Sequence, residues 1–246
     1  GARLGVARDY FGGDPEIDAL AEAAIGTLRE LGAELVDPVT FDGSFVTNVR
    51  RIADYRFKGD WESYLATFGP EVPKTVAEFL ERYDTEVAES AFPAEASVID
   101  LLSRASVTST DDPDYIDLID IVLPRNTQLK LDLFETYNID ALVFPYHASF
   151  APPIRSPIGN VDDPTFVSSG DVQSPSTLAG YSSVGFPGVV VPMGFGTQGL
   201  PMTISFFGRP YDEGKLIGYA YDYEQATMHR RPPPLAPPLP SEVIER

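Results

Sequence analysis

Residues 178–227 read LAGYSSVGFPGVVVPMGFGTQGLPMTISFFGRPYDEGKLIGYAYDYEQAT, and they are the most informative part of the chain about its fold. Two apolar runs, residues 189–195 and 202–207, flank residues 196–201 (GTQGLP), whose glycines and proline are typical of a hairpin loop. Asp212 then suits the start of a helix. Helical spacing turns three of the apolar residues that follow toward a core: Leu216, Ala220 and Tyr223. The stretch therefore predicts a pair of strands joined by a short loop and followed by a packed helix.

The amino-terminal end predicts a unit of strand, helix and strand. Residues 3–7 (RLGVA) form a short apolar run that is typical of a strand. Asp14-Pro15 is a favourable helix start, because aspartate caps free backbone N–H groups and proline fits the first turn. The helix keeps its apolar spacing until Gly32, and residues 33–36 read as the next strand. A crossover of this length implies a parallel sheet with a covering helix.

The middle of the chain, residues 45–138, reads as helical and is cut into pieces by prolines. Its last piece, residues 113–138, is expected to kink at Pro124. Helical periodicity predicts that five residues of this piece share one apolar face: Ile119, Val122, Leu129, Leu133 and Tyr137. Residues 140–145 (DALVFP) then predict a buried strand.

Together these elements predict an α/β fold, with a mixed, twisted sheet flanked by helices. We expect a single domain over residues 1–231 with a helical insert at about 45–138, and a proline-rich extended tail over residues 232–246. Residues 146–176 show little regular pattern. A loop of that length inside a compact domain is usually either functional or disordered.

The composition limits the classes of partner and site. The 246 residues include 18 basic and 37 acidic side chains, a formal charge of −19, which disfavours nucleic acid and anionic membranes as partners. Zero cysteines exclude a thiol nucleophile, thiolate zinc sites and iron–sulfur clusters. No apolar run reaches the roughly 18 residues that span a bilayer. We expect a cytoplasmic protein that does not associate with membranes.

Four segments, taken in order, resemble the amidase signature family: residues 1–6 (GARLGV), 12–16 (GGDPE), 140–143 (DALV) and 178–227. The resemblance implies a serine hydrolase of amide bonds, in which a lysine activates the catalytic serine through a second serine. In the family this centre lies in a glycine- and serine-rich segment of the amino-terminal half. The sequence begins after that segment. The resemblance therefore implies the carboxy-terminal part of the fold, with no catalytic residue of its own.

The chain offers weak substitutes for the missing centre. Residues 168–170 (SSG) imitate a serine pair but lack flanking glycines, and we interpret them as a polar turn. Each lysine lies in a polar stretch, so we interpret all four as solvated surface groups: Lys58, Lys74, Lys130 and Lys215. His147 follows a strand of the sheet and is expected to line a pocket, whereas His229 suits a helix end. Two isolated histidines disfavour a metal site, and we expect no cofactor.

The resemblance also implies where a pocket wall would lie. In the family, the loop after the 140–145 strand and the segment before the closing strands lie near the catalytic serine. We therefore expect six residues to shape the pocket and contact substrate: Tyr146, His147, Ser149, Asp171, Ser176 and Thr177. Asp171 lies close to, but out of register with, the aspartate that holds the amino group of glutamine in amidotransferase members. The sequence therefore does not predict glutamine specificity.

These observations lead to one main functional hypothesis. We expect the carboxy-terminal chain of an amidase-type hydrolase that cleaves amide bonds, and by extension ester or carbamate bonds, and that is inactive alone. Two partners are expected. One is an amino-terminal fragment or chain that carries the Ser-Ser-Lys centre, and the other is a small-molecule amide substrate. The sequence leaves open whether the chain also forms a homo-oligomer. Two alternatives remain: a non-catalytic binding or scaffold subunit, and a glutaminase subunit of an amidotransferase.

Overall fold

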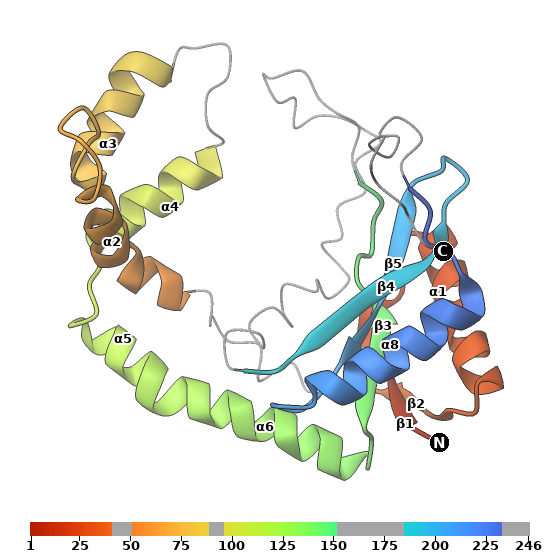
Figure 1. Cartoon of the computed structure of the whole chain (residues 1–246). Helices are drawn as coiled ribbons and strands as arrows, with labels where there is room; N and C mark the ends of the chain where they lie inside the picture. The colour runs from red at the N-terminus through yellow and green to blue at the C-terminus, as the bar shows by residue number, and fades with distance from the viewer. Residues whose placement is uncertain (41–50, 89–95, 152–184, 233–246) are drawn as a thin grey trace.

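The computed structural model describes residues 1–40, 51–88, 96–151 and 185–232, and its centre is a five-stranded sheet with the order β2-β1-β3-β5-β4 (Figure 1). The strands are β1 (Arg3–Ala7), β2 (Glu34–Val39), β3 (Ala141–Pro145), β4 (Gly188–Phe195) and β5 (Pro201–Phe207). β1 pairs in parallel with both β2 and β3, whereas β5 pairs antiparallel with β3 and β4. The predicted mixed sheet is confirmed.

Helical segments make up most of the remaining described chain. The α-helices are α1 (Pro15–Glu30), α2 (Arg51–Leu65), α3 (Val76–Arg82), α4 (Ala96–Ser106), α5 (Pro113–Asp117), α6 (Leu123–Thr136) and α8 (Glu213–Thr227). A 3-10 turn, η1 (Arg8–Tyr10), follows β1, and two π-helical turns, η3 (Tyr83–Val87) and η4 (Leu118–Val122), follow α3 and α5. None of the described helices is long and apolar enough to cross a membrane.

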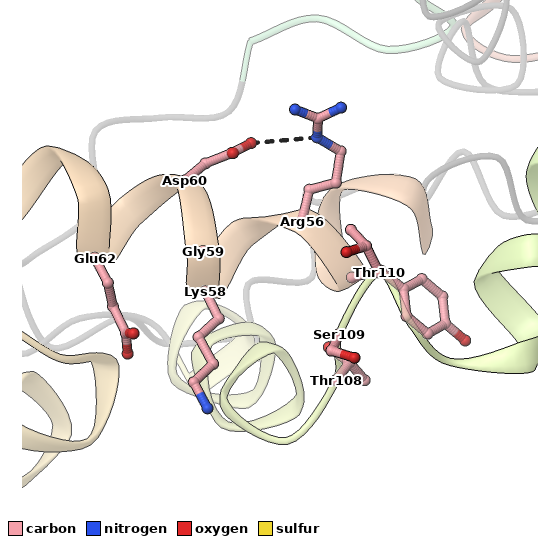
Figure 2. A pocket seen from close by; sticks show the side chains of 9 residues that line it. Arg56, Lys58, Gly59, Asp60, Glu62, Thr108, Ser109 and Thr110 are labelled. Atoms are coloured by element: carbon pink, nitrogen blue, oxygen red, sulfur yellow. Dashed lines mark hydrogen bonds and ion pairs between the residues drawn. The ribbon is translucent and has the colours of Figure 1, made fainter.

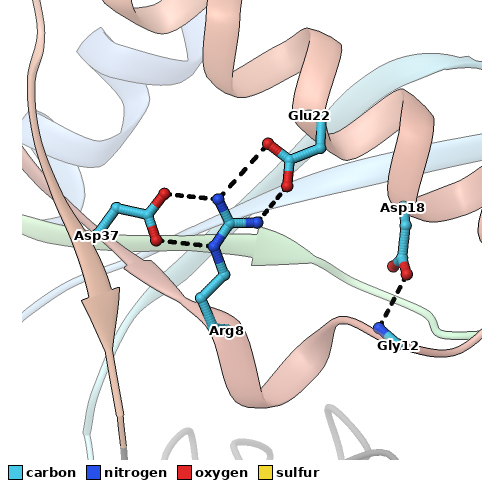
Figure 3. A network of polar contacts seen from close by, with 5 residues as sticks. All are labelled: Arg8, Gly12, Asp18, Glu22 and Asp37. Carbon is cyan, nitrogen blue, oxygen red and sulfur yellow. Dashed lines mark hydrogen bonds and ion pairs between the residues drawn. The ribbon is translucent and has the colours of Figure 1, made fainter.

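The amino-terminal unit forms as the sequence predicts. The Asp14 carboxylate accepts the Glu16 N–H at 2.8 Å and caps α1, and Gly32 ends the turn after α1 with a φ of +93°. Arg8 then ties the unit together, because its guanidinium binds Glu22 of α1 and donates two hydrogen bonds, of 2.7 and 2.5 Å, to Asp37 of β2 (Figure 3). This pairing holds the pKa of Asp37 below its ordinary value.

The carboxy-terminal unit is a hairpin followed by α8. β4 and β5 pair with Val191 opposite Ile204, and the pairing shifts between Pro192 and Gly194. Leu216, Ala220 and Tyr223 of α8 are buried as predicted. Asp212 holds the expected cap position but makes no capping hydrogen bond, because its carboxylate pairs with Lys215 at 2.8 Å.

Among the described residues, the two faces of the sheet are covered unequally. On the first face, Leu4, Val143, Ile204 and Phe206 pack in one cluster with the buried residues of α1 and α8. On the second face, Leu142, Phe144 and Phe207 pack in another cluster with Phe134 of α6 and with Phe186. Figure 1 shows α6 running from the start of β3 away from the sheet toward α5, so this helix covers only one end of the second face.

The helical insert packs through its own contacts. Trp61 of α2 lies 4.9 Å from Phe57 and 5.9 Å from Phe79 of α3, between ring centroids. Figure 1 shows α2, α3 and α4 gathered away from the sheet, and α5, η4 and α6 lead back to it. The expected helix over residues 113–138 is present as these three consecutive segments, and its irregularity is the π-helical turn η4 just before Pro124. Proline cannot donate the N–H of a regular turn, so a widened turn beside it has a physical cause.

Removal of part of the first-face core should destabilise the protein strongly. Ile204 is fully buried between the sheet and the α1 and α8 helices, so Ile204→Ala should lower the free energy of unfolding by about 2–5 kcal/mol. Ile217→Ala is the matched control, because Ile217 of α8 is 58% exposed and its truncation should change stability by at most about 0.5 kcal/mol. Urea unfolding followed by circular dichroism measures both. Equal losses would contradict this description of the core.

Candidate functional site

The loop after β3 carries three of the predicted pocket residues. The Tyr146 N–H donates to the Thr203 carbonyl at 3.0 Å, which continues the pairing of β3 with β5 by one residue. Tyr146 is 38% exposed, and its ring meets the exposed His147 ring edge-on at 4.8 Å between centroids. Ser149 is half-buried two residues further on. The structure therefore brings Tyr146, His147 and Ser149 together at the end of β3.

Two glycines let this loop pass close to neighbouring elements. The Asp14 N–H donates to the Ala148 carbonyl at 2.9 Å, and a Cβ added at Gly13 would overlap that carbonyl oxygen. At the hairpin loop, a Cβ added at Gly196 would lie 2.5 Å from Phe150. The loop after β3 is therefore fixed between the start of α1 and the β4–β5 turn, because only glycine leaves room for it.

Glu16 completes this arrangement from α1. Its carboxylate accepts the Thr197 N–H at 2.6 Å and the Thr197 hydroxyl at 3.3 Å. The Asp18 carboxylate accepts the Gly12 N–H at 2.9 Å (Figure 3). Acidic side chains thus occupy the donors near the start of α1, which agrees with the absence of phosphate-binding glycine spacing in the sequence.

The other three predicted pocket residues, Asp171, Ser176 and Thr177, lie outside the described residues, as does the serine pair at 168–169. Their convergence with Tyr146 stays a prediction. Among the described residues, no group of three or more histidine, aspartate or glutamate side chains is placed to hold a metal ion.

The interpretation of Lys130 as a surface group is wrong. Lys130 is only 2% exposed, as is Asn126 one turn earlier, and with Phe134 they form the buried face of α6. The Lys130 Nζ lies 5.6 Å from the centre of the Phe186 ring. Burial lowers the pKa of the Lys130 ammonium from 10.5 to about 8.

The π-helical turn explains why periodicity missed this face. Counting 3.6 residues per turn from the buried Leu118 leads to positions near 125, 129 and 132. A π-helical turn adds one residue and advances these positions to near 126, 130 and 133, which agrees with the burial of Asn126, Lys130 and Phe134 to within one residue. Leu129 and Leu133, which were predicted to share one apolar face, are half-buried and pack against the second-face cluster. The proline at position 124 was the available signal of the irregular turn.

The other three lysines differ from Lys130. Lys74 donates to the carbonyls of Leu65, Phe68 and Gly69 at 3.0, 2.8 and 2.8 Å, and so closes the end of α2. Lys215 pairs with Asp212, and Lys58 is exposed on α2. The prediction of surface placement is confirmed for Lys58 and Lys215.

A polar groove of about 540 Å³ lies in the helical insert, between α2 and the connection from α4 to α5. Its lining includes Arg56, Lys58, Asp60 and Glu62 of α2 and the turn at residues 108–110. Figure 2 shows Arg56 and Lys58 pointing in opposite directions, and Arg56 pairs with Asp60 at 3.3 Å. The groove therefore lacks the convergent polar groups that are typical of an active site.

The mixed sheet, with helices packed on both faces, defines an α/β protein of the amidase-signature type. The model of the family described as Amidase matches residues 1–217, and the chain belongs to that family.

Among curated proteins, the chain is similar to two that are named as the A subunit of glutamyl-tRNA(Gln) amidotransferase. The protein of Chloroflexus aggregans is 28% identical over 265 residues, which cover 96% of this chain and 47% of that protein. The protein of a Synechococcus species (strain CC9311) is 30% identical over 246 residues, which cover 94% of this chain and 47% of that protein. The chain thus spans about half the length of the curated relatives that it matches.

Among solved structures, the chain is similar to a peptide amidase in complex with the competitive inhibitor chymostatin. The TM-score is 0.69 at 30% identity, with 95% of this chain and 45% of that chain covered. The native peptide amidase of Stenotrophomonas maltophilia gives a TM-score of 0.68 at 26% identity, and the match covers 95% of this chain and 44% of that chain. These similarities confirm the predicted family and fold.

Substitution of Gly13 tests the close approach of the loop after β3. Gly13→Ala should lower the free energy of unfolding by about 1–3 kcal/mol, because the new methyl group overlaps the Ala148 carbonyl. Gly26→Ala in α1 is the control, since a Cβ there meets nothing within 4 Å and should stabilise the helix by about 0.5–1 kcal/mol. Thermal unfolding of both variants gives the comparison. If Gly13→Ala left the free energy of unfolding unchanged, the loop after β3 would not be in close contact with this residue.

The buried Lys130 should make stability depend on pH in the alkaline range. Between pH 8 and about 10.5 the unfolded chain holds a proton on Lys130 that the folded chain has lost, so stability should rise with pH across this interval. Lys130→Met should remove this rise, whereas Lys58→Met, at an exposed position, should keep it. Urea unfolding at a series of pH values measures the difference. The same pH dependence in all three proteins would contradict the burial of this ammonium.

Proposed function

We propose that this chain is the carboxy-terminal part of an amidase-type hydrolase that cleaves amide bonds, with ester and carbamate bonds as chemically related substrates. The observation that carries the proposal is the family match over residues 1–217, and the 30% identity to a peptide amidase across 95% of the chain supports it. The chain spans 45% of that peptide amidase, so the proposal concerns a larger protein or complex.

In this proposal the chain supplies framework and pocket wall. Tyr146, His147 and Ser149 lie together on a loop that is held by neighbouring elements, which suits residues that position a substrate. Asp171, Ser176 and Thr177 are proposed to extend the same wall. The catalytic serine, the bridging serine and the lysine are placed on an amino-terminal part, where backbone N–H groups would stabilise the oxyanion.

The amino-terminal part would also cover surface that this chain exposes. β4 lies at the edge of the sheet, and its Val190 is 47% exposed on the second face. An exposed strand edge with apolar side chains favours pairing with another segment. This agrees with a partner that carries the Ser-Ser-Lys centre, in a complex that we place in the cytoplasm.

A second candidate is the glutaminase subunit of an amidotransferase, because the curated relatives described above are named as the A subunit of such an enzyme. Glutamine would then be the amide substrate, and the released ammonia would pass to an acceptor. Glutamine hydrolysis that depends on an added acceptor distinguishes this candidate from a general amidase, and a scaffold subunit would show no hydrolysis of any amide.

Reconstitution tests the proposed function. The chain together with its amino-terminal part should release the amine from a simple anilide, and the chain alone should not. Replacement of the partner's signature serine by alanine should lower kcat by at least about 10³-fold, because the nucleophile is lost.

The control is the same complex carrying Ile217→Ala, an exposed change that should leave turnover intact. Equal turnover with and without the amino-terminal part, or no turnover from the complete protein, would contradict the proposal.

A further inference from the structure

The carboxylate of Glu16 links two elements that are far apart in the sequence. Glu16 is half-buried in the first turn of α1, where the helix dipole favours an acidic side chain. It accepts two hydrogen bonds from Thr197 of the β4–β5 turn, one from the backbone N–H at 2.6 Å and one from the hydroxyl at 3.3 Å. The start of α1 is therefore tied to the tip of the hairpin.

The β4–β5 turn closes on itself and leaves the Thr197 N–H to Glu16. Within the turn, the Gly196 N–H donates to the Leu200 carbonyl at 2.9 Å, and the Gly199 N–H donates to the Gly196 carbonyl at 2.8 Å. These two bonds shape the turn, whereas the bonds to Glu16 attach it to another element. A hydrogen bond to an ionised carboxylate is stronger than one between neutral groups, so this attachment is firm.

The two other carboxylates at this place serve the start of α1 itself. The Asp14 carboxylate accepts the Glu16 N–H at 2.8 Å, and the Asp18 carboxylate accepts the Gly12 N–H at 2.9 Å. Both contacts join residues that are close in sequence. Of the three carboxylates in this part of the described chain, that of Glu16 is the one that binds a distant element.

The ring of Phe150 lies against the turn that Glu16 holds. A Cβ built at Gly196 would lie 2.5 Å from the Phe150 ring and 3.3 Å from the Glu16 carboxylate, so all three groups meet at one point. Phe150 is half-buried and also packs against the first-face cluster. Release of the turn would therefore remove one of the groups that confine this ring.

Phe150 is the far end of the loop that carries the predicted pocket wall. The Tyr146 N–H fixes the start of the loop through its 3.0 Å bond to the Thr203 carbonyl, and the Ala148 carbonyl accepts the Asp14 N–H at 2.9 Å. The side chain of Tyr146 nevertheless stays 38% exposed and accessible to a ligand. The loop is thus held at its start, middle and end, and Glu16 controls the end.

We propose that Glu16 is a positioning residue of the amidase, which fixes the β4–β5 turn and, through Phe150, the exposed rings of Tyr146 and His147 where they meet the substrate. The inference rests on the proposed function. Substrate-positioning groups act only when they are held in place, and a displacement of about 1 Å can cost roughly 10²-fold in efficiency. Glu16 touches no reacting atom in this proposal, so its effect should fall on substrate binding.

Kinetics of the complete protein, including its amino-terminal part, test the proposal with a simple anilide. Glu16→Ala should raise KM about 10-fold and change kcat by less than about 3-fold, because the displaced loop binds substrate without taking part in bond cleavage. Glu16→Gln should keep KM within about 3-fold of the wild-type value, since its amide oxygen still accepts the Thr197 N–H.

Two matched controls separate the contact from its surroundings. Gln198→Ala shortens an exposed side chain in the same turn, and Glu30→Ala removes the same charge from an exposed position at the other end of α1. Both variants should have the wild-type KM, because neither alters the bonds between Glu16 and Thr197.

A double-mutant cycle tests the route through Phe150. Phe150→Ala should raise KM as Glu16→Ala does, because it removes the ring on which the turn acts. The double variant should be no worse than Phe150→Ala alone, since two residues that act in one path are not additive. Additive effects on KM would contradict the route.

Hydrogen exchange measures the loop independently of turnover. The Asp14 and Tyr146 amides donate the hydrogen bonds that hold the loop, so their exchange reports its local opening. Glu16→Ala should accelerate both about 10-fold, the size expected from loss of a hydrogen bond to a charged group. The Glu34 amide, which donates to the Ala2 carbonyl at 2.9 Å near the start of β1, should keep its rate. Mass spectrometry of peptides that contain each amide gives these rates.

Several results would overturn the inference. A lower Tm for Glu16→Ala with an unchanged KM would leave Glu16 a structural role only, and an equal rise of KM in the two control variants would remove its specific role. If the wild-type complete protein does not hydrolyse the anilide, the proposed function fails separately. Hydrogen exchange then decides the role of Glu16, which stands only if Glu16→Ala accelerates exchange at Asp14 and Tyr146 and not at Glu34.

Discussion

The parallel pairing of β1 with β3 is the constraint on which the rest of the arrangement depends. It sets Leu4 beside Ala141 and so joins segments that are far apart in the sequence. Parallel strands end at the same edge of a sheet, and the loops that follow β1 and β3 therefore meet there. The hydrogen bond from the Asp14 N–H to the Ala148 carbonyl is the direct result. Tyr146 and His147 occupy the start of that loop because the pairing holds it in place.

The described residues cover the two faces of the sheet unequally. α1 and α8 pack aliphatic and aromatic side chains against the first face, which leaves that face closed to a polar ligand. On the second face, α6 contributes Phe134 at one end and the polar pair Asn126 and Lys130 further along. Buried polar side chains require partners inside the fold, so this pair constrains how α6 packs on the sheet.

Local signals predicted the elements of the sheet correctly. The capping residue Asp14, the glycine at position 32 and the apolar alternation of β4 and β5 act over a few residues, and each produced the expected boundary within one or two positions. The prediction for Asp212 failed in part, because its carboxylate has two possible partners nearby. Asp212 holds the cap position, yet its carboxylate pairs with Lys215 instead of the helix end, because both lie within reach of it.

The order of helices and strands along the chain, the amidase family and the loop that follows β3 were all predictable from the sequence, because they depend on local patterns and on similarity along the chain. Which side of α6 faces the sheet became apparent only in the folded protein. The physical reason is the π-helical turn before Pro124, which advances the helix by one residue and brings Asn126 and Lys130 inward. A one-residue shift does not alter the composition of a helix, but it changes which side chains are buried.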